Sequence, residues 1–162
     1  MHTVRRSRVL HAPKDRVWEV IDDFGGVWKY NPGVESSRIV SGPETGQGAC
    51  RECVFSDGGR IEETILDYDP GTAYTVAFTD VGSYPLVSNT VDVTVDALDE
   101  THSDVTITAR FTPKYGPLGW LLGRVVMERQ FEKRFDAVLE GLVAHLRTGE
   151  PVGEDGEPVA SA

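Results

Sequence analysis

Two arginines and two glutamates are the residues of this sequence whose types and spacing could serve chemistry. Arg51 and Glu63 lie in neighbouring segments that each alternate between apolar and charged residues. A three-residue hairpin loop would place these two side chains opposite each other, whereas a two-residue loop would break that register. Arg124 and Glu128 are one helical turn apart. Facing an apolar interior, a guanidinium and a carboxylate can orient or protonate a carbonyl oxygen, or hold a polar head group.

The strand pattern predicts which side chains share that interior. In the two segments, the apolar residues fall on one parity and several charged residues fall on the other. Successive side chains of a strand point to opposite faces, so Arg51 and Glu63 should face inward together with the apolar set. The predicted inward residues are Arg51, Cys53, Phe55, Ile61, Glu63 and Ile65, followed on the next strand by Tyr74, Val76 and Phe78.

Each charged pair also has a structural explanation. Arg51 and Glu63 can form a cross-strand pair that only holds the sheet together. Arg124 and Glu128 can lie at the solvated end of a helix. A buried ion pair seldom stabilises a fold more than apolar packing would, so an inward pair tends to have another role. Both interpretations stay open from the residues alone.

Cys50 and Cys53 form a C-x-x-C motif, which invites a redox or zinc interpretation. A thioredoxin-type pair lies at a helix N-terminus, but this motif falls on a predicted strand, where its two side chains point to opposite faces. A tetrahedral zinc site would need further ligands, and the histidines are scattered singly along the chain. We therefore expect two free thiols, no bound metal and no cofactor.

A long amphipathic helix is predicted from Leu118 to Leu146. A Gly-Pro pair precedes it and Gly149 ends it. One face of this helix is apolar but also carries Arg124 and Glu128, which an ordinary core-facing stripe would not. The apolar residues of that face are Leu121, Phe131, Phe135, Val138, Leu139, Leu142 and Leu146.

Most of the remaining chain has the period of two that predicts strands, with two short helical pieces after the first strand. Short links rich in Gly, Pro and Asp make consecutive strands antiparallel neighbours. We expect one α+β domain over residues 1–147, in which a curved seven-stranded sheet wraps the long helix, and a disordered tail over residues 148–162. The predicted strands are Thr3–His11, Val34–Ser41, Gly48–Phe55, Arg60–Tyr68, Thr72–Thr79, Asn89–Leu98 and Val105–Pro113.

The composition argues against several classes of partner. With 26 acidic and 16 basic residues, the formal net charge is −10, which disfavours nucleic acid and anionic membrane surfaces. No apolar run approaches the roughly 18 residues that suggest a membrane span. The N-terminus also lacks the apolar core of a signal peptide. We expect a cytoplasmic protein without stable membrane insertion, and the low cysteine content agrees with this.

Several short motifs, taken in order, resemble one protein family. They are residues 17–20 (Val-Trp-Glu-Val), residues 28–32 (Trp-Lys-Tyr-Asn-Pro), Arg51 on one strand, Glu63 on the next, and residues 111–113 (Phe-Thr-Pro) before a long helix. This order resembles the START-like polyketide cyclase/dehydrase and lipid transport family. The resemblance implies a helix-grip fold, in which a curved seven-stranded sheet grips the last helix around a deep cavity.

The resemblance implies a ligand cavity and leaves its use open. We expect the chain to bind a small hydrophobic or amphipathic molecule such as a lipid, a polyketide or an isoprenoid. The alternative is a cyclase or dehydratase in which Arg51, Glu63 or Glu128 acts on a carbonyl oxygen. Relatives of both kinds share the fold, so the fold cannot choose between them. The expected ligand-binding residues are Arg51, Glu63, Tyr74, Phe78, Pro85, Arg124, Met127, Glu128 and Phe131.

Two surface features complete the predictions. The link Asp80–Ser88 is the longest in the expected sheet, and Gly82 and Pro85 would let it act as a lid over the cavity. On the outer side of the long helix, a strip of apolar and small residues could dock a protein, a second copy of the chain or a lipid surface. This outer strip comprises Gly119, Leu122, Gly123 and Val126.

Overall fold

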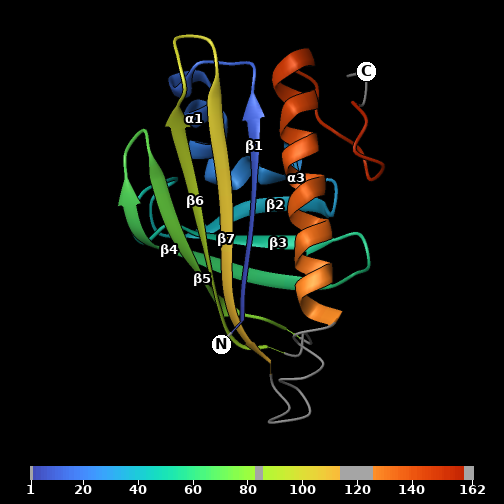
Figure 1. Cartoon of the computed structure of the whole chain (residues 1–162). Helices are drawn as coiled ribbons and strands as arrows, with labels where there is room; N and C mark the ends of the chain where they lie inside the picture. Colours follow the sequence, from blue (N-terminus) through green and yellow to red (C-terminus); the bar gives the residue numbers. More distant parts are fainter. Residues whose placement is uncertain (1, 83–85, 114–125, 159–162) are drawn as a thin grey trace.

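The computed structural model of the chain describes residues 2–82, 86–113 and 126–158 (Figure 1). Within these residues, seven strands form one antiparallel sheet with the order β1-β7-β6-β5-β4-β3-β2, so the first strand pairs with the last. The predicted α+β architecture is therefore confirmed. The strands are β1 His2–Leu10, β2 Val34–Ser41, β3 Cys50–Phe55, β4 Arg60–Asp69, β5 Ala73–Asp80, β6 Leu86–Ala97 and β7 Ser103–Pro113.

Helical elements of the described chain flank the sheet. The α-helix α1 spans Lys14–Asp22, the 3-10 helix η1 spans Phe24–Lys29, and the long α-helix α3 spans Glu128–Thr148. Because α1 and η1 are too short to be stable alone, they depend on burying residues such as Val17 and Ile21 against the sheet. No helix in the described parts is long and apolar enough to cross a membrane.

Helix α3 has a different start from the predicted one. The periodicity predicts a start at Leu118, but residues 118–125 lie outside the described residues and the described helix begins at Glu128. Residues 126–127 directly before it form a wider, π-type turn. The helix ends at Gly149, as predicted, because its left-handed φ of 75° lets its N–H bond back to the last turn.

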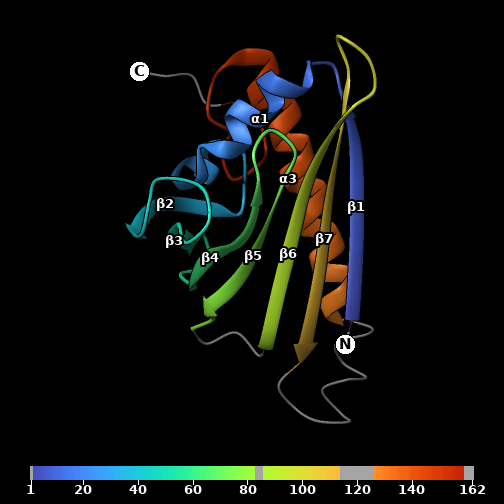
Figure 2. The same ribbon diagram turned by 90° about the vertical axis from the view of Figure 1, so that its left-hand side faces the viewer.

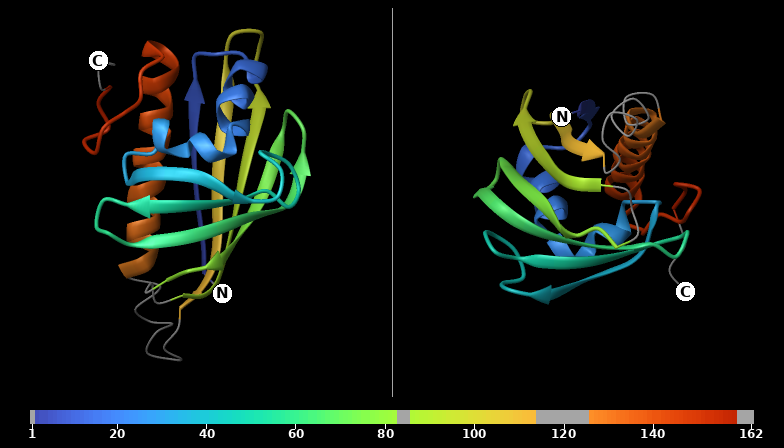
Figure 3. Two further views of the ribbon diagram at one scale, coloured as in Figure 1. Left: turned by 180° about the vertical axis from the view of Figure 1, so that it is seen from behind. Right: turned by 90° about the horizontal axis from the view of Figure 1, so that it is seen from below.

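The sheet curves around an interior that α3 closes on one side. Figures 1 and 3 show β1 running beside α3, with β7 and β6 next in the sheet, while β2 and β3 turn across them. Figure 2 shows α1 and η1 on the same inner side, at the far end from the N-terminus. Register shifts in the β2–β3 and β4–β5 pairings mark bulges, which increase the local bend of a strand. The curved sheet therefore packs around α3 in the arrangement that the helix-grip prediction requires.

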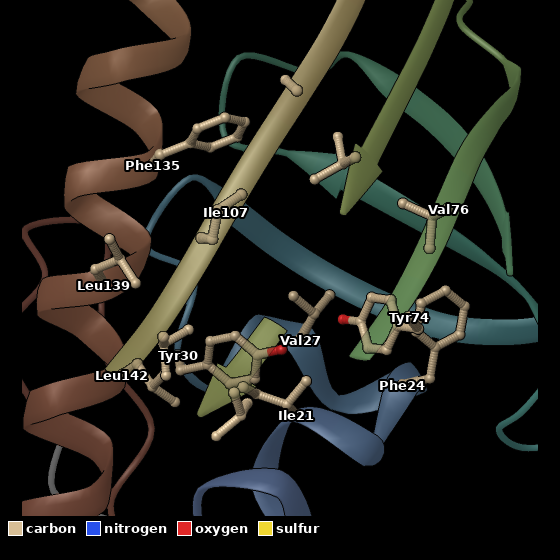
Figure 4. Packing of buried hydrophobic residues seen from close by; sticks show 14 of the residues in the cluster. Ile21, Phe24, Val27, Tyr30, Tyr74, Val76, Ile107, Phe135, Leu139 and Leu142 are labelled. Atoms are coloured by element: carbon tan, nitrogen blue, oxygen red, sulfur yellow. The ribbon is translucent and has the colours of Figure 1, made fainter. Parts of the chain in front are cut away.

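A glycine sets how closely α3 approaches the rest of the interior. Phe135, Leu139 and Leu142 point from α3 into the core, which confirms the predicted apolar face (Figure 4). On the same half of the helix, a Cβ atom at Gly141 would lie 2.1 Å from the backbone oxygen of Tyr30. Any larger side chain would push the helix away, so glycine is required at this contact.

The C-terminal segment differs from the predicted disordered tail. The N–H of Val152 donates to the carbonyl of Lys29 at 2.9 Å, and Val152 itself is 7% exposed. Val152 also forms an isolated bridge with Pro158. A groove of about 560 Å³ separates residues 154–157 from α3. The composition of this segment did not predict the docking, because a single buried valine contributes little to the average hydrophobicity.

The link between β5 and β6 is shorter than predicted. Strand β6 begins at Leu86, whereas the sequence pattern predicts a start at Asn89. Residues 83–85, including Pro85, lie outside the described residues, so the lid stays a prediction.

Candidate functional site

Arg51 and Glu63 face each other in the interior, and the predicted register is confirmed. The two residues are direct partners in the β3–β4 pairing. Nη2 of Arg51 lies 3.4 Å from Oε2 of Glu63. Arg51 is 6% exposed and Glu63 is 7% exposed, so this ion pair is almost completely removed from water.

Helix η1 fixes the guanidinium of Arg51 from the other side. Nη1 donates to the backbone oxygen of Phe24 at 3.0 Å, and the guanidinium carbon lies 4.0 Å from the centre of the Phe24 ring. Burial lowers the pKa of Arg51, but the negative charge of Glu63 opposes this, and the net pKa lies well above its ordinary value. The Nε atom has no hydrogen-bond partner among the described residues. The interior therefore contains a permanent cation with one donor to spare.

Two buried tyrosines lie beside this pair. Tyr74 comes from β5 and Tyr30 follows η1, and their exposed fractions are 3% and 4%. Their hydroxyl groups point toward each other (Figure 4). Burial raises the pKa of Tyr30 and of Tyr74. Both hydroxyls therefore stay protonated and can donate hydrogen bonds.

Cys53 of β3 completes this arrangement. Its Sγ donates to Oε1 of Glu63 at 3.5 Å, and burial together with the Glu63 charge raises the pKa of the thiol to about 12. Cys50 and Cys53 are both free and buried. The described residues contain no group of His, Cys, Asp and Glu that could hold a metal ion. We refer to Tyr30, Arg51, Cys53, Glu63 and Tyr74 as the arginine–tyrosine cluster.

A second polar group lies where α3 begins. Nδ1 of His2 is 3.2 Å from Oε1 of Glu128, which joins β1 to the first turn of α3. The His2 ring stacks on Phe111 with their centres 5.2 Å apart, and Phe111 contacts the ring of Phe131 at 4.7 Å. The side chain of Glu128 is 30% exposed, so this His2–Glu128 pair lies at the border of the interior.

The predicted ligand-binding residues separate into groups. Arg51, Glu63 and Tyr74 lie together in the arginine–tyrosine cluster. Pro85 and Arg124 lie outside the described residues, so the predicted ion pair of Arg124 stays a prediction. The remaining predicted residues are partly buried, and they are Phe78, Met127, Glu128 and Phe131.

The sequence-based prediction missed Tyr30, His2 and Asn89. Asn89 is 2% exposed and shares the inward parity of β6 with the buried Val91 and Val95. A polar residue in an otherwise apolar stripe was the signal that could have identified it. His2 has no comparable local signal, because its partner on α3 is 126 residues away in the chain.

This arrangement concentrates hydrogen-bond donors on an apolar inner face. Arg51 supplies a fixed positive charge, while Tyr30 and Tyr74 supply neutral hydroxyls. Donors that are buried and held in place interact strongly with a carbonyl oxygen or an oxyanion, because the surrounding dielectric constant is low. The cluster is therefore suited to hold or polarise one oxygen atom of a largely apolar molecule.

Comparisons with solved structures identify the same architecture elsewhere. The protein XoxI from Bacillus cereus has a TM-score of 0.75 at 19% identity, over 91% of this chain and 97% of that chain. The Zhui aromatase/cyclase from Streptomyces sp. R1128 has a TM-score of 0.67 at 18% identity, over 90% and 93%. Ara h 8.0201 has a TM-score of 0.71 at 18% identity, over 91% and 98%. At such identities the likeness shows the helix-grip fold alone.

The sequence itself identifies the family. A search of curated proteins gives no significant match. The family model described as polyketide cyclase / dehydrase and lipid transport matches residues 1–147, which include the sheet and almost all of α3. The chain therefore belongs to the polyketide cyclase / dehydrase and lipid transport family.

Proposed function

We propose that the chain binds a small hydrophobic or amphipathic molecule, such as a lipid, a polyketide or an isoprenoid, between the sheet and α3. The observation that carries this proposal is the buried Arg51–Glu63 pair with two tyrosine hydroxyls beside it. Apolar side chains would stabilise the core at least as well as this ion pair, so a ligand that needs the charge explains its presence. A mostly apolar pocket with a few convergent polar groups is the usual form of a small-molecule site.

In this proposal the ligand is held at two kinds of surface. Its carbonyl or hydroxyl oxygen accepts hydrogen bonds from Arg51 and Tyr74. Its apolar body packs on Phe78, Met127 and Phe131, which are partly buried beside the core. The lipid transport function in the description of the family supports a ligand of this kind.

The test begins with the purified protein. Organic extraction followed by mass spectrometry should identify a copurifying ligand, and calorimetry then gives its affinity. Glu63→Gln removes the charge that holds Arg51 and should weaken binding by about 1–3 kcal/mol, which is roughly 5- to 150-fold. Glu62→Gln is the matched control, because Glu62 is the adjacent residue of β4 and faces the opposite way. Equal affinities of the two variants would argue against a ligand at the cluster.

A cyclase or dehydratase activity is the second candidate. It is favoured by Tyr74, whose buried hydroxyl remains protonated beside a fixed guanidinium and can donate a proton to a carbonyl oxygen. The structural likeness to an aromatase/cyclase supports this candidate. Tyr74→Phe should then leave the affinity within about threefold while conversion of the copurified ligand falls by about a hundredfold. If the wild-type protein does not convert its copurified ligand, this result would contradict the enzyme candidate and support binding as the function.

We also propose a cytoplasmic location, which the free thiols Cys50 and Cys53 support because such thiols persist in a reducing compartment. Docking of a partner on the outer strip of the last helix remains a prediction. Of that strip, only Val126 lies among the described residues, and it is 45% exposed.

A further inference from the structure

Asn89 is buried on the inner face of β6 with both polar atoms of its amide unpartnered. It is 2% exposed, and neither Nδ2 nor Oδ1 has a hydrogen-bond partner within the part of the chain that the structure describes. Leaving a buried amide group unsatisfied costs about 1–3 kcal/mol. Folded proteins therefore contain few such groups, and those that remain are expected at functional sites.

The strand register places this amide in the interior, away from the arginine–tyrosine cluster. Asn89 is the direct partner of Phe111 in the β6–β7 pairing, and Phe111 is the direct partner of His2 in the β1–β7 pairing. Direct partners point to the same face of a sheet, so Asn89 faces the same side as Phe111, whose ring contacts Phe131 of α3. In the sheet β7 lies between β6 and β1, and β1 runs beside α3 (Figure 1).

The separation between the two polar sites sets a minimum size for a ligand that contacts both. Asn89 belongs to β6 and Glu63 to β4, and only β5 lies between these strands. Strands are spaced by roughly 4.8 Å, so the two positions are about 10 Å apart across the sheet. A ligand that contacts both must therefore span the gap between side chains that start from backbone positions about two strand spacings apart.

The chemistry of the amide defines the group that it can bind. A carboxamide presents an N–H donor and a carbonyl acceptor side by side in one plane. Its best complement is a planar group that offers one acceptor beside one donor. The carboxylate of Glu128 lies on the same side of the interior, where it would repel an anionic head group. The aromatic rings of Phe111 and Phe131 suit a flat, neutral group.

We propose that Asn89 is a ligand-binding residue for a neutral planar group that donates one hydrogen bond and accepts another, as a carboxamide or a lactam does. This inference rests on the proposed function, because it assigns the second polar contact of the same internal ligand.

The first test compares three probes on the full chain by calorimetry. 2-Naphthamide offers both a donor and an acceptor, 2-acetylnaphthalene offers only the acceptor, and 2-naphthoate carries a negative charge. We expect 2-naphthamide to bind most tightly and 2-acetylnaphthalene about fivefold more weakly, which corresponds to one lost hydrogen bond. Asn89→Leu should make the two neutral probes bind alike. Asn31→Leu is the control, because the Asn31 side chain accepts only from the exposed N–H of Gly33 and should leave the preference unchanged.

The second test separates binding from a structural role. If Asn89 serves a ligand, Asn89→Leu should raise the melting temperature of the unliganded protein, because the substitution removes unsatisfied buried groups. Asn89→Ala should remove the probe preference in the same way, and it remains informative if leucine does not fit the site. Lower stability in both variants with an unchanged probe preference would overturn the inference.

The outcomes also distinguish this inference from the function on which it rests. Equal binding of the two neutral probes by wild-type protein would overturn the role of Asn89 while supporting an internal apolar site. Absence of binding by all three probes at millimolar concentration would overturn both proposals.

Discussion

At the scale of single residues, the Arg51–Glu63 pair makes each partner depend on the other. Glu63→Leu leaves a buried guanidinium without its counter-charge, and we expect the free energy of unfolding to fall by about 3–5 kcal/mol. The double variant Arg51→Met with Glu63→Leu should lose less, because no charge remains in the interior. Urea unfolding at neutral pH measures both losses. Arg60→Gln is the control, since Arg60 is 53% exposed and its ion pairs should contribute less than about 1 kcal/mol.

An equal or larger loss in the double variant would contradict this view of the pair. It would mean that the shapes of the two side chains, rather than their charges, hold β3 and β4 together.

The Cys53 thiol predicts how stability depends on alkaline pH. Its pKa is about 12 in the folded protein, against an ordinary value of 9.0, so the folded state keeps a proton that the unfolded state releases. Its contribution to stability is complete below pH 9 and is lost as the pH rises from 9 to 12, by up to about 1.4 kcal/mol per unit. In Cys53→Ala the free energy of unfolding should begin to fall only near pH 10, where Tyr30 and Tyr74 lose their protons in the unfolded state but keep them in the folded state. Identical pH profiles of the variant and the wild type, measured by urea unfolding, would disprove the assignment.

The sequence predicted the part of the site that strand alternation controls. Arg51, Glu63 and Tyr74 lie on strands joined by short hairpins, so their parity and register follow from local pattern. Asn89 could have been placed by the same alternation, because it is the polar member of the apolar stripe of β6, but His2 could not. The surroundings of His2 depend on the pairing of β1 with β7 and on its contact with Glu128, which bring together residues far apart in the chain.

At the scale of elements, the C-terminal segment should contribute measurably to stability. Truncation after Gly149 removes the buried Val152 and its hydrogen bond to Lys29, and we expect a loss of about 1–3 kcal/mol. Truncation after Pro158 retains the bridge between Val152 and Pro158 and serves as the control. Thermal unfolding of both truncated chains measures the difference. Equal melting temperatures would show that the segment does not hold η1.

The contact at Gly141 should tolerate no side chain. A Cβ atom there would overlap the backbone oxygen of Tyr30, so Gly141→Ala should destabilise the protein by about 1–3 kcal/mol. The sign of this change is informative, because replacing glycine by alanine in a helix interior normally raises the free energy of unfolding by about 1 kcal/mol. Glu140→Ala, on the exposed side of the same turn, should change stability by less than about 0.5 kcal/mol. Chemical denaturation measures both, and a more stable Gly141→Ala variant would contradict the contact.

The elements that the sequence predicted best are those with strict periodicity and clear turn residues. The bounds of β2 agree completely, and the other strands differ from prediction by a few residues at their ends. The start of the long helix and the position of the tail could not be obtained in this way. A helical period does not mark where a helix begins, and the docking of Val152 on η1 depends on a tertiary contact.

At the scale of the whole molecule, the two halves of α3 are held unequally. The second half buries Leu139, Gly141, Leu142 and Ala144, whereas among the described residues of the first half only Phe135 is buried. We expect amides of residues 132–135 to exchange with deuterium at least about tenfold faster than those of residues 139–146, because local opening needs fewer buried contacts to break. Hydrogen-exchange mass spectrometry tests this. Uniform exchange along the helix would contradict it.

The close approach at Gly141 gives the domain a pivot. From that point the helix extends as a lever to Glu128, a length of about 20 Å at 1.5 Å per residue. A rotation of about 5° around the pivot would move the Glu128 end by nearly 2 Å. The side-chain contacts that such a movement would strain join β1 to this half of α3, and they are His2 with Glu128 and Arg6 with Glu132 and Asp136. Such a rotation would leave every pairing of the sheet in place, because α3 takes no part in the strand pairing. If the chain binds an internal ligand as proposed, ligands of different thickness would be accommodated by the angle of one helix, which turns where Gly141 lacks a side chain.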